Sequence, residues 1–213
     1  MKRSRDTHLL SSLGSYLSEH ALPAALQRSE KYCKVTEMLL KTAHTCLKSS
    51  GQTPPVACLF GLMTRFGTNP SILSHVIKLL ALALLINKGD DILFLKVTDI
   101  LAGYCTMEHK EQVRIAVSKA LAKVLTLLNE TVEEKRFAGQ LSMLYALVIL
   151  LNDEQPDIRY YLCESPALSQ VIDFENLQPW KVLADGYTVK LNDMYVLETL
   201  FANFTKRLQT KSP

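Results

Sequence analysis

The feature that most constrains this chain is a succession of apolar segments, several of which are introduced by a helix-start signal. Asn69-Pro70 places a capping side chain directly before a proline, and Ser165-Pro166 repeats this arrangement. Asp90 stands before a third segment as a further N-cap. Alternating runs bounded by Asn-Gly or Asp-Gly turns, which would indicate hairpins, do not occur in the sequence. The sequence therefore predicts an all-α protein of about 8–10 helices.

These signals also predict where the helices begin and end. Pro23 is expected to open a long helix, Gly89 to cap the end of another, and Thr131 with Glu134 to form a capping box. Short links between long helices favour antiparallel neighbours. The expected helices cover about 7–20, 23–49, 55–66, 70–87, 91–105, 108–128, 132–151, 156–164, 166–172 and 191–209.

The segment 108–128 shows how the helical interpretation places one charged residue. At 100° per residue its valines, alanines and leucines fall in one broad arc, with Lys119 and Lys123 on the opposite side. Arg114 lies inside the apolar arc, near Leu121 and Leu125. An arginine in such a place needs a carboxylate or carbonyl groups as partners, because an unpaired buried charge is very costly.

A local pattern recurs along the chain. Glu108-His-Lys-Glu-Gln-Val-Arg114 and Asp153-Glu-Gln-Pro-Asp-Ile-Arg159 align without gaps at a spacing of 45 residues. Solenoids built of helix pairs have periods of roughly 40–47 residues. The acid-x-x-x-x-[Val/Ile]-Arg signature resembles the HEAT repeat of the HEAT/armadillo superfamily. The resemblance implies that Glu108 and Asp153 lie at turns between paired helices, and that these acids bond to Arg114 and Arg159 across adjacent repeats in a ladder.

The resemblance covers roughly residues 55–172 and implies an α-solenoid of stacked antiparallel helix pairs. The pairs would be 91–105 with 108–128, and 132–151 with 156–172, preceded by 55–66 with 70–87, which lacks the arginine. Ser165-Pro166 interrupts the last second helix, and no third Val-Arg pair follows. An irregular helical bundle is the alternative.

We expect one helical domain over 1–213. It would consist of N-terminal helices in 1–54, the HEAT-like pairs in 55–172, and an irregular segment with a C-terminal capping helix in 173–213. Trp180, the only tryptophan, lies in this last part. It is expected either to close the open end of the stack or to anchor a partner protein.

Composition and motifs restrict the chemistry. Phosphate-binding loops, nucleophile elbows and zinc-binding histidine pairs are absent from the sequence, so we expect no enzyme activity, no cofactor and no metal. The five cysteines have no C-x-x-C spacing and are interpreted as reduced thiols of an intracellular protein, cytoplasmic or nuclear. The longest apolar runs hold eight residues, too few to cross a membrane.

Lys34, Lys41 and Lys48 recur every seven residues and therefore share one face of a helix. One interpretation is a solvated face opposite Met38, Leu39 and Cys46. The other is a strip that contacts an acidic peptide or a phosphate backbone. The net charge of +3 is small for a domain that depends on nucleic-acid phosphates.

These observations favour a non-enzymatic protein–protein interaction module or a scaffold subunit of a larger complex. The alternative is a nucleic-acid-associated HEAT-like accessory protein that assists a DNA- or RNA-processing enzyme. An enzyme whose site lies between helices without a linear motif is a third possibility. The sequence leaves the oligomeric state open.

Overall fold

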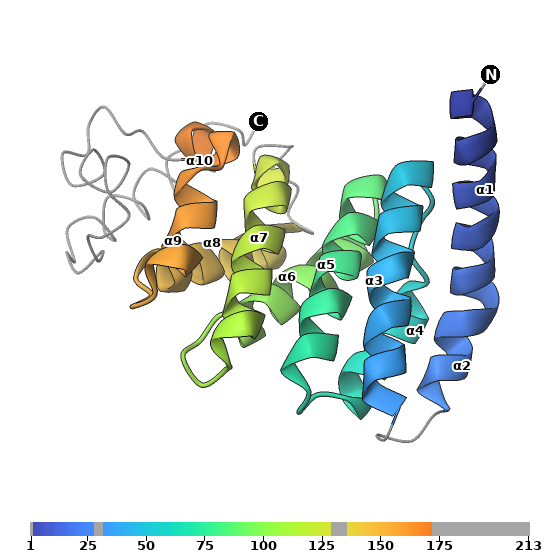
Figure 1. Cartoon of the computed structure of the whole chain (residues 1–213). Coiled ribbons are helices and arrows are strands. Elements are labelled where there is room, and N and C mark those ends of the chain that lie inside the picture. The colour runs from blue at the N-terminus through green and yellow to red at the C-terminus, as the bar shows by residue number, and fades with distance from the viewer. Residues whose placement is uncertain (1, 28–31, 129–135, 172–213) are drawn as a thin grey trace. The chain divides into compact units, whose positions relative to one another are not determined.

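The computed structural model describes residues 2–27, 32–128 and 136–171, and these residues are built from helices and their connections (Figure 1). No β-strand occurs in the described ranges. The prediction of an all-α protein is confirmed.

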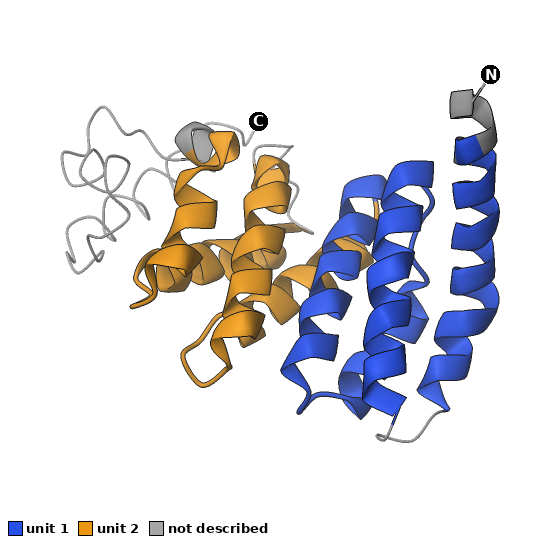
Figure 2. Cartoon of the chain, viewed as in Figure 1, with its two compact units in different colours: residues 1–89 blue, residues 90–213 orange. Residues whose placement is uncertain are grey.

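The chain divides into two compact units, residues 1–89 and residues 90–213 (Figure 2). The boundary falls within the stretch 55–172 that the sequence assigned to helix pairs, and the expected single domain stays a prediction. Each unit is described by itself below.

Unit 1 contains α1 (Lys2–Tyr16), a π-helical turn (Leu17–Ala21), α2 (Leu22–Leu26), α3 (Cys33–Ser50), α4 (Val56–Arg65) and α5 (Pro70–Ile86). Helix α3 packs between α1 and α5, and α4 packs against α2 and α5 (Figure 1). Apolar side chains that are fully buried fill the space between these helices, among them Leu22, Leu40, Leu59, Leu62 and Leu79.

The prediction that Pro23 opens a long helix is wrong. The first helix instead continues through the π-turn into α2, where Pro23 occupies the first turn, and α3 begins only at Cys33. In the π-turn the amide of Leu22 donates to the carbonyl of Leu17, five residues back. Proline lacks an amide hydrogen and its ring collides with the preceding turn of a regular α-helix, so a wider turn accommodates it.

Two of the predicted helix starts are confirmed by their hydrogen bonds. The side chain of Asn69 accepts from the amides of Ser71 and Ile72, both at 3.1 Å, and Asp90 accepts from the amide of Leu93 at 2.9 Å. The predicted capping box of Thr131 and Glu134 lies outside the described residues.

The predicted C-terminal cap at Gly89 is wrong, because α5 ends at Ile86 and its C-cap is Asn87. The amide of Asn87 donates the last hydrogen bond of the helix, to the carbonyl of Ala83, so the helix ends two residues before Gly89. A glycine cap is found instead at Gly51, which ends α3 with a φ of 67°. Glycine adopts this left-handed conformation without steric cost.

Unit 2 contains α6 (Asp91–Tyr104), α7 (Glu111–Val124) with a 3₁₀ extension (Leu125–Leu128), α8 (Phe137–Leu151), α9 (Pro156–Cys163) and α10 (Pro166–Val171). Helix α6 packs against α8, and α7 packs against α9. The apolar arc predicted for 108–128 is buried, whereas Lys123 is exposed. The predicted helix 191–209 lies outside the described residues.

Candidate functional site

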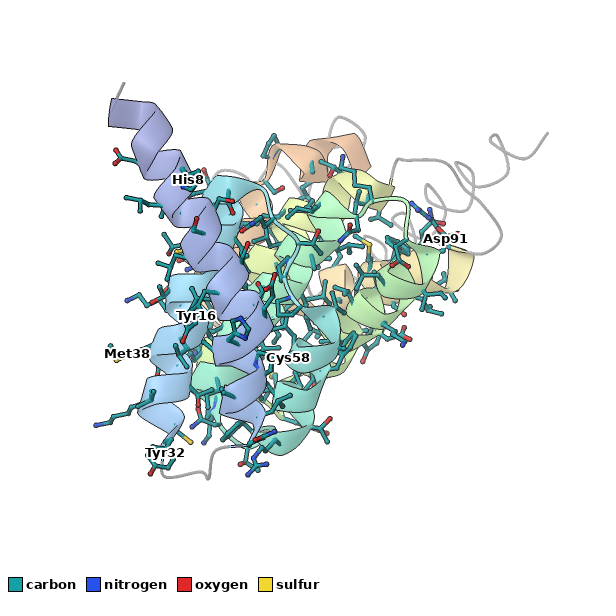
Figure 3. All side chains as sticks on the ribbon, turned by 90° about the vertical axis from the view of Figure 1, so that its right-hand side faces the viewer. His8, Tyr16, Tyr32, Met38, Cys58 and Asp91 are labelled. Carbon is teal, nitrogen blue, oxygen red and sulfur yellow. The ribbon has the colours of Figure 1, made fainter. Side chains whose placement is uncertain are left out.

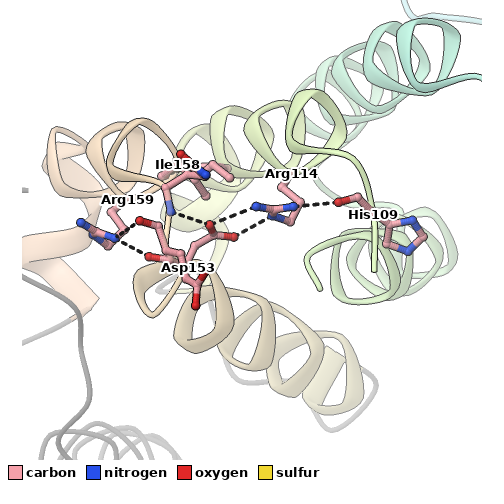
Figure 4. Close-up of polar contacts among 8 residues, drawn as sticks. His109, Arg114, Asp153, Ile158 and Arg159 are labelled. Carbon is pink, nitrogen blue, oxygen red and sulfur yellow. Dashed lines mark hydrogen bonds and ion pairs between the residues drawn. The ribbon is translucent and has the colours of Figure 1, made fainter. Parts of the chain in front are cut away.

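The polar centre of unit 2 is the Arg114 guanidinium, which pairs with a carboxylate in the turn that follows α8. Its Nε donates to one carboxylate oxygen of Asp153 at 2.7 Å and its Nη2 donates to the other at 3.2 Å (Figure 4). The Arg114 side chain is 10% exposed and that of Asp153 is 1% exposed. The two-point contact therefore joins α7 to the turn between α8 and α9 with little access for water.

Arg159 occupies the same local position in its helix as Arg114. The Nη1 group of Arg114 donates to the carbonyl of His109 at 2.7 Å, and that of Arg159 donates to the carbonyl of Glu154 at 3.1 Å. Both acceptors precede their arginine by five residues. Arg159 also donates to the backbone carbonyl of Asp153 (Figure 4).

The four residues predicted to form a ladder are thus not all brought together. Arg114, Asp153 and Arg159 form one cluster, while Glu108 is exposed, and the bonds described for Arg114 go to Asp153 and His109. The polar groups of the cluster bond to one another and to the nearby backbone. One oxygen of Asp153, for example, also accepts the amide of Gln155 at 2.9 Å. Such an arrangement fixes helices and has little capacity left for a ligand.

A third buried arginine, after Arg114 and Arg159, was not predicted from the sequence. Arg136 is 7% exposed, its Nε donates to Asp91 at 2.5 Å, and its guanidinium carbon lies 5.3 Å from the centre of the Phe94 ring. Asp91 and Arg136 are 45 residues apart, the spacing that also separates Arg114 from Arg159. This shared spacing is the signal that would have indicated the pair.

Serine hydroxyls make further links between the helices of unit 2. Ser118 on α7 donates to the carbonyl of Ile158 at 2.6 Å, and Ser165 donates to the carbonyl of Ala122 at 2.9 Å. Ser142 on α8 donates to a carboxylate oxygen of Asp99 on α6 at 2.7 Å. Each bond joins residues 40 or 43 positions apart.

The predicted lysine stripe lies on the exposed face of α3, where Lys34, Lys41 and Lys48 are all exposed. The expectation that this face is opposite Met38 is wrong, because Met38 is 70% exposed and lies on the same face. In Figure 3 Met38 lies at the outer edge of the view, whereas Cys58 of α4 is buried. Met38 is four residues after Lys34 and three before Lys41, and residues at these spacings are neighbours on a helix.

Helix α1 carries an apolar row that sequence reasoning did not identify. Leu9, Leu13 and Tyr16 are 66%, 43% and 58% exposed. Their spacing of four and three residues puts them along one side of the helix, and the Tyr16 ring lies 5.4 Å from that of His20. We call these three residues the α1 row. Its signal in the sequence was the spacing of four and three residues within the predicted helix 7–20.

Burial shifts the pKa of several titratable groups among the described residues. No group of three or more His, Cys, Asp or Glu side chains in the described ranges could hold a metal ion. Burial raises the pKa of the Cys58 and Cys105 thiols to about 11, so neither is a ready nucleophile at neutral pH. Burial and the neighbouring Lys78 lower the pKa of His75.

Two further expectations concern Trp180 and helices that could cross a membrane. Trp180 lies outside the described residues, so its role as lid or anchor stays a prediction. Among the described helices none is long and apolar enough to span a bilayer.

Comparison of the chain with protein-family models, with curated proteins and with solved structures yields no match.

Proposed function

We propose that this chain is a non-enzymatic protein–protein interaction module, built from HEAT-like stacked helix pairs, that serves as a scaffold subunit of a larger complex. An intracellular site, cytoplasmic or nuclear, accompanies the proposal, since all five cysteines are free thiols.

The internal contacts of unit 2 support the stacked-pair part of the proposal. The first helices of its two pairs, α6 and α8, pack on each other, and so do the second helices, α7 and α9. The polar links between them join residues 39 to 45 positions apart, which is close to one repeat. Arg114 and Arg159 have equivalent backbone partners, which further supports two copies of one structural unit.

The observation that carries the functional part is the α1 row. Contact of three large apolar side chains with water on one side of a helix is unfavourable. A partner surface that covered them would lower the free energy. Helix pairs stacked on their neighbours leave extended helix faces for recognition. Aromatic residues such as Tyr16 are enriched at protein interfaces.

A nucleic-acid-associated accessory protein is the second candidate, and the exposed lysines of α3 favour it. Binding that rests on phosphate contacts weakens steeply as the salt concentration rises. A labelled DNA or RNA duplex that binds at low salt and dissociates with added salt would support this second candidate.

The interaction function is tested by comparing variants of the full chain in affinity purification with quantitative mass spectrometry. Replacing each residue of the α1 row by Asp should remove at least about nine-tenths of a specifically retained partner. The matched control adds the same charge on exposed residues elsewhere in unit 1, through Ala24→Asp, Ser49→Asp and Ala57→Asp. This control variant should retain the partner. Equal retention by both variants would contradict the proposed role of this row.

A further inference from the structure

The exposed face of α3 combines positive charge with an apolar centre. It consists of Lys34, Met38, Lys41 and Lys48, flanked by Val35, and we call it the lysine–methionine face. Met38 and Val35 are 70% and 43% exposed, and all three lysines are exposed. With a rise of 1.5 Å per residue, Lys34 and Lys48 are about 21 Å apart along the helix axis. The face is therefore long enough to match several turns of a partner helix.

Positive charge exceeds negative charge on helices α3 and α5. Glu37, the one acidic residue of α3, lies three residues after Lys34 and four before Lys41 and so neighbours both lysines, and its carboxylate is 3.9 Å from His75 of α5. The charges of Lys41 and Lys78 reach His75 as well, so α5 adds positive charge rather than an acidic counterpart on this side. The face is consequently complementary to an acidic surface.

We propose that the lysine–methionine face binds an acidic amphipathic helix of a partner protein. An apolar side chain of that helix would cover Met38 and Val35, and carboxylates about one and three turns away would approach the three lysines. This inference rests on the proposed interaction function and names the chemistry of one partner segment.

The apolar centre distinguishes such a helix from a nucleic acid. A phosphate backbone would use the lysines but would leave Met38 exposed beside charged groups. The methionine side chain is flexible and polarisable, and it adapts to the apolar faces of helices. The lysine stems also cover apolar surface while their ammonium groups remain available for carboxylates.

The test uses the full chain and a fluorescein-labelled helical peptide of about 20 residues, with glutamates spaced by seven and leucines between them on the same face. Binding is followed by fluorescence anisotropy. The variant Lys34→Glu/Lys41→Glu/Lys48→Glu should raise the Kd by about tenfold or more, because three favourable charge pairs become repulsive. The matched control makes the same change on three exposed lysines of unit 2, Lys96, Lys110 and Lys123, and should change the Kd by less than about twofold. Circular dichroism verifies that both variants are folded.

The apolar part is tested with Met38→Gln, which keeps the size of the side chain but makes it polar. We expect a rise in the Kd of about threefold for the peptide, and no change for a peptide whose leucines are replaced by glutamine. A carbodiimide that couples carboxylates to amines in contact should link the peptide to Lys34, Lys41 or Lys48, as mapped by mass spectrometry.

Three results would overturn the inference. These are no binding of the peptide to the wild-type chain, equal loss of binding in the lysine variant and its control, and tighter binding of single-stranded DNA that is insensitive to Met38→Gln. If any of these occurs while the α1-row variant still loses its partner, the inference fails and the interaction function stands. If that variant also retains its partner, the proposed function fails with it.

Discussion

The two units join their helices by different means. In unit 2 buried polar side chains cross between helices: Arg114 reaches Asp153, Arg136 reaches Asp91, and Ser118 reaches the backbone of α9. In unit 1 the helices meet mainly through buried leucines such as Leu40 and Leu59. Among the described residues of unit 1, the hydrogen bonds from Gln52 to Ser11 and Ser15 are only partly buried, and His75 and Glu37 approach each other to 3.9 Å.

The two types of contact differ in how strictly they fix the register of neighbouring helices. A two-point arginine–carboxylate contact is satisfied in one register, so sliding α7 along its neighbours would strand a buried charge. Leucine packing depends on volume and tolerates small shifts more easily. Polar links thus fix the register of the helices in unit 2, whereas the helices of unit 1 are held mainly by apolar burial.

The largest effect is expected from Asp153→Ala. The substitution leaves the Arg114 guanidinium buried without its carboxylate and should lower the free energy of unfolding by about 3–5 kcal/mol. Urea denaturation measures the loss, and hydrogen exchange should localise it to unit 2. The control Asp157→Ala removes an exposed acid from the first turn of α9 and should cost less than about 1 kcal/mol. If Arg114→Met/Asp153→Ala is as unstable as the sum of the single variants, the pair is not coupled.

The counterpart in unit 1 is Leu59→Ala. Leu59 is fully buried, and the cavity left by the change should lower the free energy of unfolding by roughly 2–5 kcal/mol. The same hydrogen-exchange experiment should show the loss of protection in residues 1–89 and not in residues 90–128. An equal loss of protection in both units would show that they unfold together. The two units would then differ in how their helices pack but not in their stability.

A pair of glycines gives a smaller and sharper comparison. A Cβ added at Gly139 on α8 would lie 2.7 Å from the Phe94 ring and 2.8 Å from the Thr98 hydroxyl of α6. At Gly61 it would meet only the end of the flexible Leu26 side chain, at 2.9 Å. Gly139→Ala should therefore lower the free energy of unfolding by about 1–3 kcal/mol. Gly61→Ala should be close to neutral, because the gain in helix propensity of about 1 kcal/mol offsets the crowding. Thermal denaturation measures the stability of both variants. A larger loss for Gly61→Ala than for Gly139→Ala would contradict the closer approach of α8 to α6.

The smallest effect concerns the pH dependence of unit 1. Burial, with Lys78 and Lys41 adding to it, lowers the pKa of His75 from the usual 6.5. The unfolded chain then binds more protons than the folded one just below pH 6.5, so the stabilising contribution is present above 6.5 and is lost as the pH falls toward the folded-state pKa. The wild type should lose stability relative to His75→Gln in this range. Urea midpoints measured for both proteins from about pH 5 to about pH 8 test this, and parallel curves would exclude the contribution.

The accuracy of the sequence predictions followed the range of the interactions that decide each feature. The helix starts at Asn69 and Asp90 depend on a side chain and an amide two or three residues away, and both are confirmed. The helix start predicted at Pro23 and the helix end predicted at Gly89 depended on the conformation of the neighbouring turn, and both predictions were wrong. Met38 was placed on the wrong face because its apolar character was assumed to mean burial, whereas its position in the helix puts it among the lysines.

The sequence by itself determined the helical class, most helix positions and the need of Arg114 for a partner, because periodicity and capping act over one or two turns. The tertiary structure alone decided that Asp153 rather than the nearby Glu108 is that partner, and that Arg136 is buried against Asp91. It also decided which sides of α1 and α3 are exposed. These outcomes depend on which helices come together across some 40 residues of chain, and local sequence chemistry does not encode that choice.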